Sequence, residues 1–186
     1  MMKNPNRCAY VNMGNPLYIR YHDEEWGVPE HSDQKLFEML LLECFQAGLS
    51  WECVLNKREA FRAAFDHFDV DKIACYGEEK IQQLMNNPAI IRNRLKIKAS
   101  ITNAIVFKQI QAEYDSFDAY IWGYTNGETI IEEYTVRTTS PLSDRISKDL
   151  KQRGMKFVGS TIIYSYLQAV GILNAHGKEC DWYKHD

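Results

Sequence analysis

The sequence contains no run of apolar residues long enough to cross a membrane, which needs roughly 18 to 20 in succession. Its beginning, MMKNPNRCAY, also lacks the apolar core of a secretory signal peptide. These two absences predict a cytoplasmic protein without a membrane partner. No internal repeat, low-complexity tract or obvious linker divides the 186 residues, so we expect one domain over residues 1–186.

An excess of positive charge is also missing, because the formal net charge is -3 at pH 7. This value argues against a wholly basic nucleic-acid coat but allows one basic face, since local clustering sets the field that a ligand meets. RNRLKIK at 92–98 and RISKDLKQRGMK at 145–156 are two such clusters. Each cluster has two interpretations of about equal weight: a surface that contacts a phosphate backbone, or an ordinary solvated helix. In the first cluster the candidate DNA contacts are Arg92, Arg94 and Lys96.

Hydrophobic periodicity predicts helices along most of the chain, and the expected fold class is all-α. Residues 32–47 repeat apolar side chains at helical spacing, with Ser32 at the N-cap position and Gly48 past the end. The connector PAIIRN, between two further helices, suggests a helix-hairpin-helix. Residues 125–135 contain an Asn-Gly pair and predict a loop or weak hairpin. The other expected helices cover residues 50–65, 69–77, 77–87, 94–114, 116–124, 140–154 and 158–173.

The segment YIRYHDEEWGVPE, residues 18–30, is dense in aromatic and acidic side chains. Tyr18, Tyr21 and Trp26 fit no single helix or strand face, and glycine and proline end the segment. We therefore expect a polar, aromatic-rich loop. Such a composition indicates a functional site, in which Trp26 is expected only to pack beside the other residues.

Candidate metal ligands stand near both ends of the sequence, as Cys8 and His22 at one end and His176 and Cys180 at the other. His176 and Cys180 are spaced to share one helix face, which would let both bind one tetrahedral Zn²⁺. The spacing alone leaves an incidental pair as the commoner explanation. Two Cys and two His would leave no open position, so such an ion would be structural. Three further cysteines are expected in the core: Cys44, Cys53 and Cys75.

Glu43 interrupts the apolar run MLLLECF, where a carboxylate is costly unless it is hydrogen-bonded or meets a cation. One interpretation places Glu43 on the solvated side of an amphipathic helix. The other places Glu43 and Trp51 around a pocket with Tyr18 and Tyr21. Aromatic faces and a carboxylate would together hold a flat, positively charged ligand.

Several stretches, in order along the chain, resemble the bacterial 3-methyladenine DNA glycosylase I family. The similarity runs from about residue 8 to residue 180. Its most specific parts are YHDEEWG and QAGLSW. The stretches that carry it are CAYVN, PLYIRYHDEEWGVPE, LFEMLLLECFQAGLSW, KREAFRAAF, IIRNRLKI, KFVGSTIIYSYLQAVG and HGKEC.

The resemblance implies an all-helical fold related to the helix-hairpin-helix DNA glycosylases, with a core over residues 8–180. It also implies a small zinc-bearing lobe formed by residues 1–30 and 160–186. One structural Zn²⁺ would join the two ends of the chain. By the resemblance, its ligands are Cys8, His22, His176 and Cys180.

The same resemblance implies a DNA repair enzyme that flips 3-methyladenine out of alkylated double-stranded DNA and hydrolyses its N-glycosidic bond. An abasic site remains, and no lyase step is expected. Separately from the resemblance, we expect a monomer. Glu43 is the candidate catalytic residue. The candidate base-binding residues are Tyr18, Tyr21 and Trp51.

In the QAGL turn, Leu49 is expected to act as an apolar wedge that fills the gap left by the flipped base, with Gln46 beside it. The hairpin PAIIRNRLKI departs from helix-hairpin-helix loops, because it has no glycine to bring backbone N–H groups close to phosphate. The N–H groups at a helix start near residues 159–161 are another candidate phosphate contact.

Two other functions remain as alternatives. A metal-dependent phosphohydrolase could use the pair His22 and Asp23, but His31, His67 and His185 lie in no supporting pattern. Loss of all activity on gentle chelation, with the fold intact, would favour it. A non-catalytic helical DNA-binding module held together by zinc would instead bind damaged duplex without releasing a base.

Overall fold

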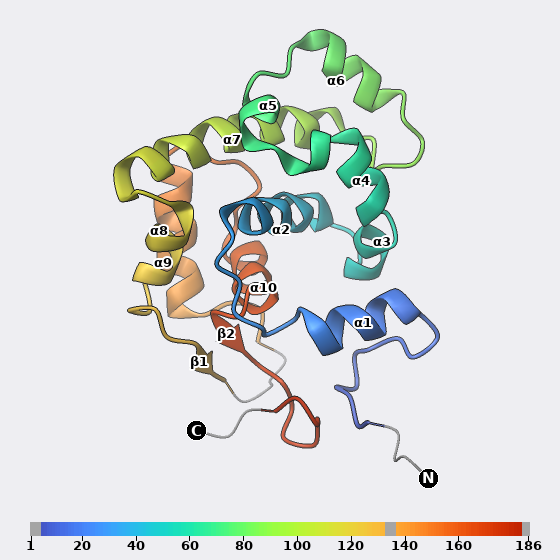
Figure 1. Ribbon diagram of the computed structural model, residues 1–186, viewed down its shortest axis with the longest axis vertical. Coiled ribbons are helices and arrows are strands. Elements are labelled where there is room, and N and C mark those ends of the chain that lie inside the picture. Colours follow the sequence, from blue (N-terminus) through green and yellow to red (C-terminus); the bar gives the residue numbers. More distant parts are fainter. Residues whose placement is uncertain (1–4, 133–136, 184–186) are drawn as a thin grey trace.

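The computed structural model describes residues 5–132 and 137–183, and helices dominate this part of the chain (Figure 1). The predicted all-α class is confirmed. None of the described helices is both long and apolar enough to cross a bilayer. The helices are α1 (Pro16–Glu24), α2 (Asp33–Gln46), α3 (Trp51–Leu55), α4 (Arg58–Ala64), α5 (Val70–Ala74), α6 (Glu78–Met85), α7 (Arg94–Tyr114), α8 (Phe117–Gly123), α9 (Pro141–Gln152) and α10 (Ser160–Ala169), with one 3₁₀ helix, η1 (Asp66–Phe68).

Helix α2 runs through the centre of the molecule, between α7 on one side and α10 on the other (Figure 1). Its residues 36–45 are all buried, including two glutamates, so this helix is enclosed on every side. Fully buried Leu36, Leu40 and Leu41 each contribute about 2 kcal/mol by leaving water. The predicted helix over 32–47 is therefore confirmed, with Ser32 at its N-cap.

The predicted helix over residues 50–65 is divided into α3 and α4. Asn56 ends α3, and its side-chain Oδ1 accepts a hydrogen bond of 2.9 Å from Asn15 Nδ2. Asparagine competes with the helix for hydrogen bonds and favours such ends. An apolar stripe nevertheless continues through the break, because Val54, Leu55 and Phe61 are all buried.

The expectation of a loop over residues 18–30 is wrong for its first half, because residues 18–24 lie in α1. Asn15 caps this helix by accepting from the N–H of Leu17, and Pro16 occupies the first turn. Asn15 and Pro16 lie before residues 18–30, so the sequence of residues 18–30 alone does not show where the helix begins. On α1, Tyr18 and Tyr21 stand three residues apart and share one face.

Of the loop or weak hairpin predicted within residues 125–135, the loop is present at residues 125–129 and the hairpin is not among the described residues. Strand β1 (Ile130–Ile131) pairs in parallel with β2 (Leu173–Asn174), with Ile130 opposite Leu173. A parallel pair needs a crossover, which α9 and α10 supply. Residues 133–135 of this prediction lie outside the described residues.

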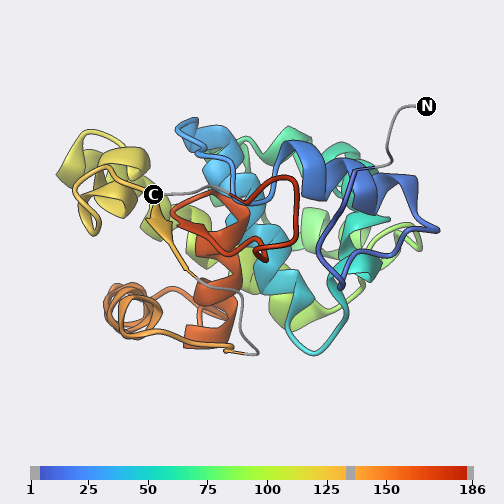
Figure 2. The same cartoon turned by 90° about the horizontal axis from the view of Figure 1, so that it is seen from below.

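The first and last described segments lie side by side (Figures 1 and 2). The backbone N–H of Asn6 donates to Asp181 Oδ2 at 2.9 Å, and the N–H of Asp181 donates to the Asn6 carbonyl at 2.9 Å. Close to these ends, Gly171 has φ +75°, and a Cβ there would stand 2.2 Å from the carbonyl carbon of Val28. Only glycine therefore allows the chain after α10 to pass against the segment that follows α1.

Candidate functional site

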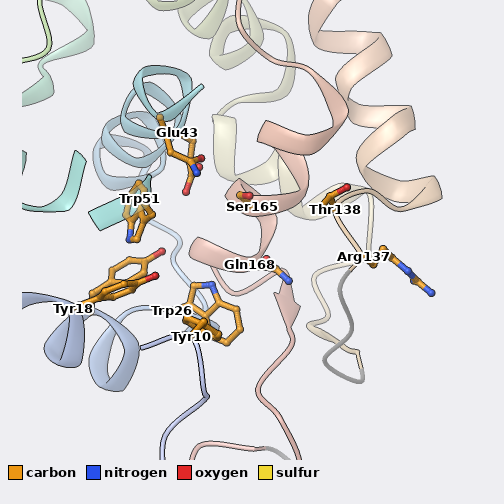
Figure 3. Close-up of a pocket in the computed structure, with 11 residues that line it drawn as sticks. Tyr10, Tyr18, Trp26, Glu43, Trp51, Arg137, Thr138, Ser165 and Gln168 are labelled. Atoms are coloured by element: carbon orange, nitrogen blue, oxygen red, sulfur yellow. The ribbon is translucent and has the colours of Figure 1, made fainter. Parts of the chain in front are cut away.

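A cavity of about 400 Å³ opens between α1, α3, the end of α2 and α10 (Figure 3). All four predicted pocket residues, from three different helices, line it. Their placement in one cavity supports the interpretation of a ligand pocket, while their individual roles stay predictions. The lining residues are Tyr10, Tyr18, Tyr21, Trp26, Glu43, Gln46, Trp51, Arg137, Thr138, Ser165 and Gln168.

The aromatic wall of the cavity is built from α1 and the start of α3. Tyr18 and Tyr21 face it from α1, with ring centres 6.5 Å apart. Trp51 is the first residue of α3, and its ring lies 5.1 Å from that of Tyr21 at an angle of 45°. Tyr10 adds a further ring 6.4 Å from Tyr18. Flat faces from several directions suit a planar ligand.

Glu43 reaches the cavity from the buried central helix, and its residue is only 3% exposed. The interpretation that placed it on a solvated face is wrong. Burial raises the pKa of the Glu43 carboxyl to about 8. Among the described residues, Glu43 Oε2 has no hydrogen-bond partner. A buried acceptor without a partner is costly, so this atom is poised for a donor or a cation brought by a ligand.

Two other buried polar atoms at the cavity are also without a hydrogen-bond partner among the described residues. Gln46 Oε1 and Trp51 Nε1 have no hydrogen-bond partner in the described part of the chain. Together with Glu43 they provide acceptors and one donor within the same wall. The arrangement fits recognition of a flat heterocycle by both its face and its edge.

The sequence interpretation missed part of this pocket. Trp26 was assigned to packing, but it lines the cavity as well as stacking on the ring of His22 at 6.2 Å. Ser165 and Gln168 come from α10, and Arg137 and Thr138 from the segment before α9. The one available signal was that Ser165 and Gln168 stand three residues apart, as polar positions within the mostly apolar stretch IIYSYLQA.

The four predicted metal ligands form one buried cluster, with all ligand atoms within 4.8 Å of one another. Cys180 Sγ lies 3.5 Å from His176 Nδ1 and 3.6 Å from His22 Nε2, and Cys8 Sγ lies 3.6 Å from His176 Nδ1. Ligands at the usual zinc distances in a tetrahedron stand about 3.6 Å apart, so this geometry and donor set fit Zn²⁺. The site can therefore hold a metal ion.

The prediction that His176 and Cys180 share a helix face is wrong, because they lie in a turn after β2. The N–H of Cys180 donates to the carbonyl of Gly177 at 2.8 Å, which folds the chain back on itself. Of the other cysteines, Cys44 is buried, Cys53 is partly buried and Cys75 is exposed. The core prediction is thus wrong for Cys75, which ends α5.

Neighbouring groups orient both histidine ligands. His22 Nδ1 is 2.8 Å from Asp23 Oδ1, and Arg7 holds the same carboxylate through Nε at 2.8 Å. His176 Nε2 lies 3.1 Å from the carbonyl oxygen of Trp26. These contacts leave Nε2 of His22 and Nδ1 of His176 facing the cluster, as metal-binding histidines require.

The surroundings of His22 do not support a phosphohydrolase site. Asp23 is occupied by Arg7 and His22, and His22 faces the cysteines. His31 and His67 are exposed elsewhere, and His185 lies outside the described residues.

The predicted DNA-contact residues are dispersed. Arg92 is exposed, and Arg94 forms an ion pair with Glu78. Lys96 is buried and its Nζ donates to the carbonyls at the end of α2, so its prediction as a phosphate contact is wrong. A pattern of charges does not show which lysine is enclosed. Leu49 stands 41% exposed in the α2–α3 turn, residues 46–50.

A second pair of helices forms a tighter helical hairpin than α6 and α7. Helices α9 and α10 pack closely, and the α9–α10 turn, residues 153–159, includes Gly154 at φ +105° and Phe157 at φ +56°. This turn has the glycine that the connector PAIIRN lacks. It also leads into the N-terminus of α10, whose first N–H groups have no acceptor within the helix.

Comparisons with known proteins identify the family. Residues 11–184 match the methyladenine glycosylase family. The chain is 46% identical over 181 residues to DNA-3-methyladenine glycosylase 1 of Escherichia coli (strain K12), covering 95% of this chain and 96% of that protein. It is 40% identical over 178 residues to DNA-3-methyladenine glycosylase of Haemophilus influenzae, covering 94% of this chain and 96% of the relative.

Solved structures show the same fold. A crystal structure of 3-methyladenine DNA glycosylase I matches with a TM-score of 0.92 and 45% identity, over 96% of this chain and all of the other. A structure of the Staphylococcus aureus protein, which concerns its recognition of 3-methyladenine, matches with a TM-score of 0.92 and 36% identity. That match covers 99% of this chain and 100% of the other.

Proposed function

The chain belongs to the methyladenine glycosylase family, and on this premise we propose that it is a DNA-3-methyladenine glycosylase that acts in the repair of alkylated DNA. The observation that carries the proposal is the cavity in which the buried, unpartnered Glu43 faces the aromatic side chains of α1 and α3. Such a pocket fits a flat base that carries a positive charge.

Charge decides which base the pocket accepts. Methylation at N3 makes the adenine of DNA cationic, so it attracts Trp51 by stacking and the Glu43 carboxylate by ion pairing. The free pocket keeps Glu43 protonated near neutral pH because burial raises its pKa to about 8, and the arriving cation favours its ionised form. An uncharged adenine brings no positive charge, so ionisation of Glu43 beside it would leave a buried carboxylate without compensation.

The cationic base also simplifies the chemistry. It leaves without being protonated, and water captures the oxocarbenium-like sugar to give an abasic site. A lyase step would need an amine nucleophile, and no lysine is among the described residues that line the cavity. We therefore propose a monofunctional hydrolase, in which Glu43 binds the base and stabilises the cationic transition state.

Entry of the base requires flipping, because its glycosidic bond is not accessible within the duplex. We assign the filling of the gap to Leu49, which is exposed in the α2–α3 turn. Gln46, whose carbonyl accepts from the N–H of Leu49 at 2.7 Å, lines the pocket. The α9–α10 turn, with Gly154 and the first N–H groups of α10, supports a phosphate contact. Arg92 adds positive charge from the other exposed connector.

We further propose that the buried cluster of two cysteines and two histidines binds one structural Zn²⁺. When bound, the ion would supply cross-linking of the two ends rather than reactivity, because the four protein ligands complete a tetrahedron.

The proposal is tested by measuring release of free bases from methylated duplex DNA by chromatography. Wild type should release 3-methyladenine and leave 7-methylguanine in place. Glu43→Gln and Trp51→Ala should each lose about 100-fold or more in kcat/KM while staying folded, since each removes an interaction with the reacting base.

The matched control is Glu24→Gln, which changes an exposed carboxylate on α1 and should keep wild-type activity. Folded, metal-loaded wild type that binds alkylated duplex but releases no base would contradict the proposal. A non-catalytic DNA-binding module would then be the better description.

A further inference from the structure

Lys96 is a buried lysine whose ammonium group donates to backbone carbonyls. The residue is 6% exposed, and Nζ donates to the carbonyl of Phe45 at 2.7 Å and to the carbonyl of Ala47 at 2.6 Å. In the described part of the chain, no Asp or Glu forms an ion pair with it. Burial of a charged group is costly, so both hydrogen bonds are needed to hold this lysine in place.

The Phe45 carbonyl belongs to the last turn of α2, and the Ala47 carbonyl lies at the C-cap, where the α2–α3 turn begins. Carbonyl groups in the last turn of a helix lack partners within the helix and carry its partial negative charge. Ala47 already has non-helical dihedrals, φ −46° and ψ 114°, and Gly48 follows at φ +80°. Lys96 is thus a side-chain cap that fixes the point at which the chain leaves α2 toward Leu49.

The same face of α7 also holds the α9–α10 turn. Asn103 lies two helical turns after Lys96, and its Oδ1 accepts from the N–H of Lys156 at 2.8 Å while its Nδ2 donates to the Lys156 carbonyl at 3.0 Å. The Lys96 ammonium lies 5.9 Å from the centre of the neighbouring Phe157 ring. One helix therefore sets the positions of both turns that the proposed function directs toward DNA.

We propose that Lys96 is a positioning residue that holds the α2–α3 turn, and with it Leu49, in its DNA-binding conformation before DNA arrives. The inference rests on the proposed function, in which Leu49 fills the gap left by the flipped base. A turn that is already ordered loses less conformational entropy on binding, so insertion of Leu49 becomes more favourable.

The base pocket is anchored separately from this cap. Trp51 begins α3, and the neighbouring Glu52 Oε1 accepts hydrogen bonds from Asn12 Nδ2 at 2.8 Å and Asn15 Nδ2 at 2.7 Å. Loss of the Lys96 cap should therefore disturb Leu49 more than Trp51. Affinity for free 3-methyladenine separates the two effects.

The experiment uses duplex DNA with a stable abasic-site analogue and the fluorescent base 2-aminopurine next to it. Insertion of Leu49 changes the stacking and so the fluorescence of 2-aminopurine. We expect Lys96→Met to lower affinity for this DNA about tenfold or more and to remove most of the fluorescence change, because the turn is no longer held. Binding of free 3-methyladenine should stay within about twofold.

A double-mutant cycle with Leu49→Ala shows whether Lys96 acts through the turn. In the Leu49→Ala background, Lys96→Met should cost no more than about a further twofold, since the side chain to be positioned is gone. Full additivity of the two losses would overturn the inference. Lys108→Met is the control, because Lys108 is an exposed lysine on the same helix that pairs with Asp71, and it should bind as wild type does.

Order of the α2–α3 turn can also be measured in the free wild-type protein, without the Lys96 variant. NMR relaxation of the free wild-type protein should show order parameters near 0.8 for the amides of residues 48–50, and values below about 0.6 would overturn the inference even if Lys96→Met did not fold. Neither this measurement nor DNA binding requires release of a base. If wild type releases no 3-methyladenine, the proposed function fails while the fluorescence and relaxation data still decide the role of Lys96.

Discussion

At the scale of single residues, Glu43 links recognition of the base to the stability of the fold. Burial raises the pKa of its carboxyl from 4.5 to about 8, so the folded protein holds a proton that the unfolded chain releases. Between these two pH values the folded state binds more protons than the unfolded state. The free energy of unfolding therefore falls as pH rises, and the loss is complete above the folded pKa.

Glu43→Gln should remove this dependence. The melting temperature of the variant minus that of wild type should increase steadily from pH 5 to pH 8, by roughly 4 °C or more, because each unit of pKa shift is worth about 1.4 kcal/mol. Thermal unfolding at four pH values measures it. Glu24→Gln, at an exposed position, should follow the wild-type curve. Parallel curves for Glu43→Gln and wild type would show that Glu43 does not carry the linkage.

Residue type alone identified much of this site. A carboxylate inside an apolar run and a cysteine and histidine pair at each end of the chain are unusual enough to be recognised without a structure. Lys96 was misassigned, because its neighbours in the sequence are exposed and basic while its own side chain turns inward to α2. The part of Trp26 in the pocket depends on packing between distant segments, which no local pattern records.

At the scale of elements, the aromatic wall depends on the junction between α1 and α3. Asn15 caps α1 through Oδ1, and its Nδ2 donates to Glu52 Oε1 on α3 at 2.7 Å and to Asn56 Oδ1 at 2.9 Å. A single side chain thus begins one helix and ties it to the helix that carries Trp51. The spacing between Tyr21 and Trp51 follows from this junction.

Asn15→Ala should therefore affect both stability and ligand binding. Loss of the cap should cost about 1 to 2 kcal/mol in the free energy of unfolding, and affinity for 3-methyladenine should fall severalfold as α1 and α3 separate. Ser116→Ala removes a comparable cap on α8, where the Ser116 side chain accepts from the N–H of Ala119. It should reduce stability to a similar degree without changing affinity. Denaturant unfolding and titration with the base measure the two quantities, and equal affinity losses would contradict the junction's role.

Elements with strong local signals were predictable and those set by distant contacts were not. Helices α2, α7 and α9 carry apolar periodicity or clear caps, such as Ser140 and Pro141 at the start of α9. The pairing of β1 with β2 has no such signal, because the two short strands are separated in the sequence by α9 and α10. Division of residues 50–65 likewise depends on Asn56 meeting Asn15, a contact between separate helices.

At the scale of the whole molecule, the Cys and His cluster joins the beginning of the described chain to its end. Removing the metal with a chelator should lower the melting temperature by several degrees and reduce base release only as far as folded protein is lost, with both restored by Zn²⁺, because binding of the ion stabilises only the folded state. Metal analysis should find one ion per chain in wild type and much less in Cys180→Ser.

Cys75→Ser is the matched control for this experiment, because Cys75 is exposed and lies outside the cluster. It should keep the full metal content and the wild-type melting temperature. Base release that survives complete removal of the metal, with an unchanged melting temperature, would contradict a structural ion.

The joined ends also determine how the molecule responds to mechanical force. Tension applied to the two ends reaches first the cluster and the two hydrogen bonds between Asn6 and Asp181, before it reaches any helix. With a metal ion bound, the load passes from Cys8 directly to Cys180, and the helices between them carry none of it. An unfoldase that pulled on both ends would have to break metal–ligand bonds before it could extend the chain. The force needed for unfolding would therefore depend on metal occupancy rather than on packing of the hydrophobic core.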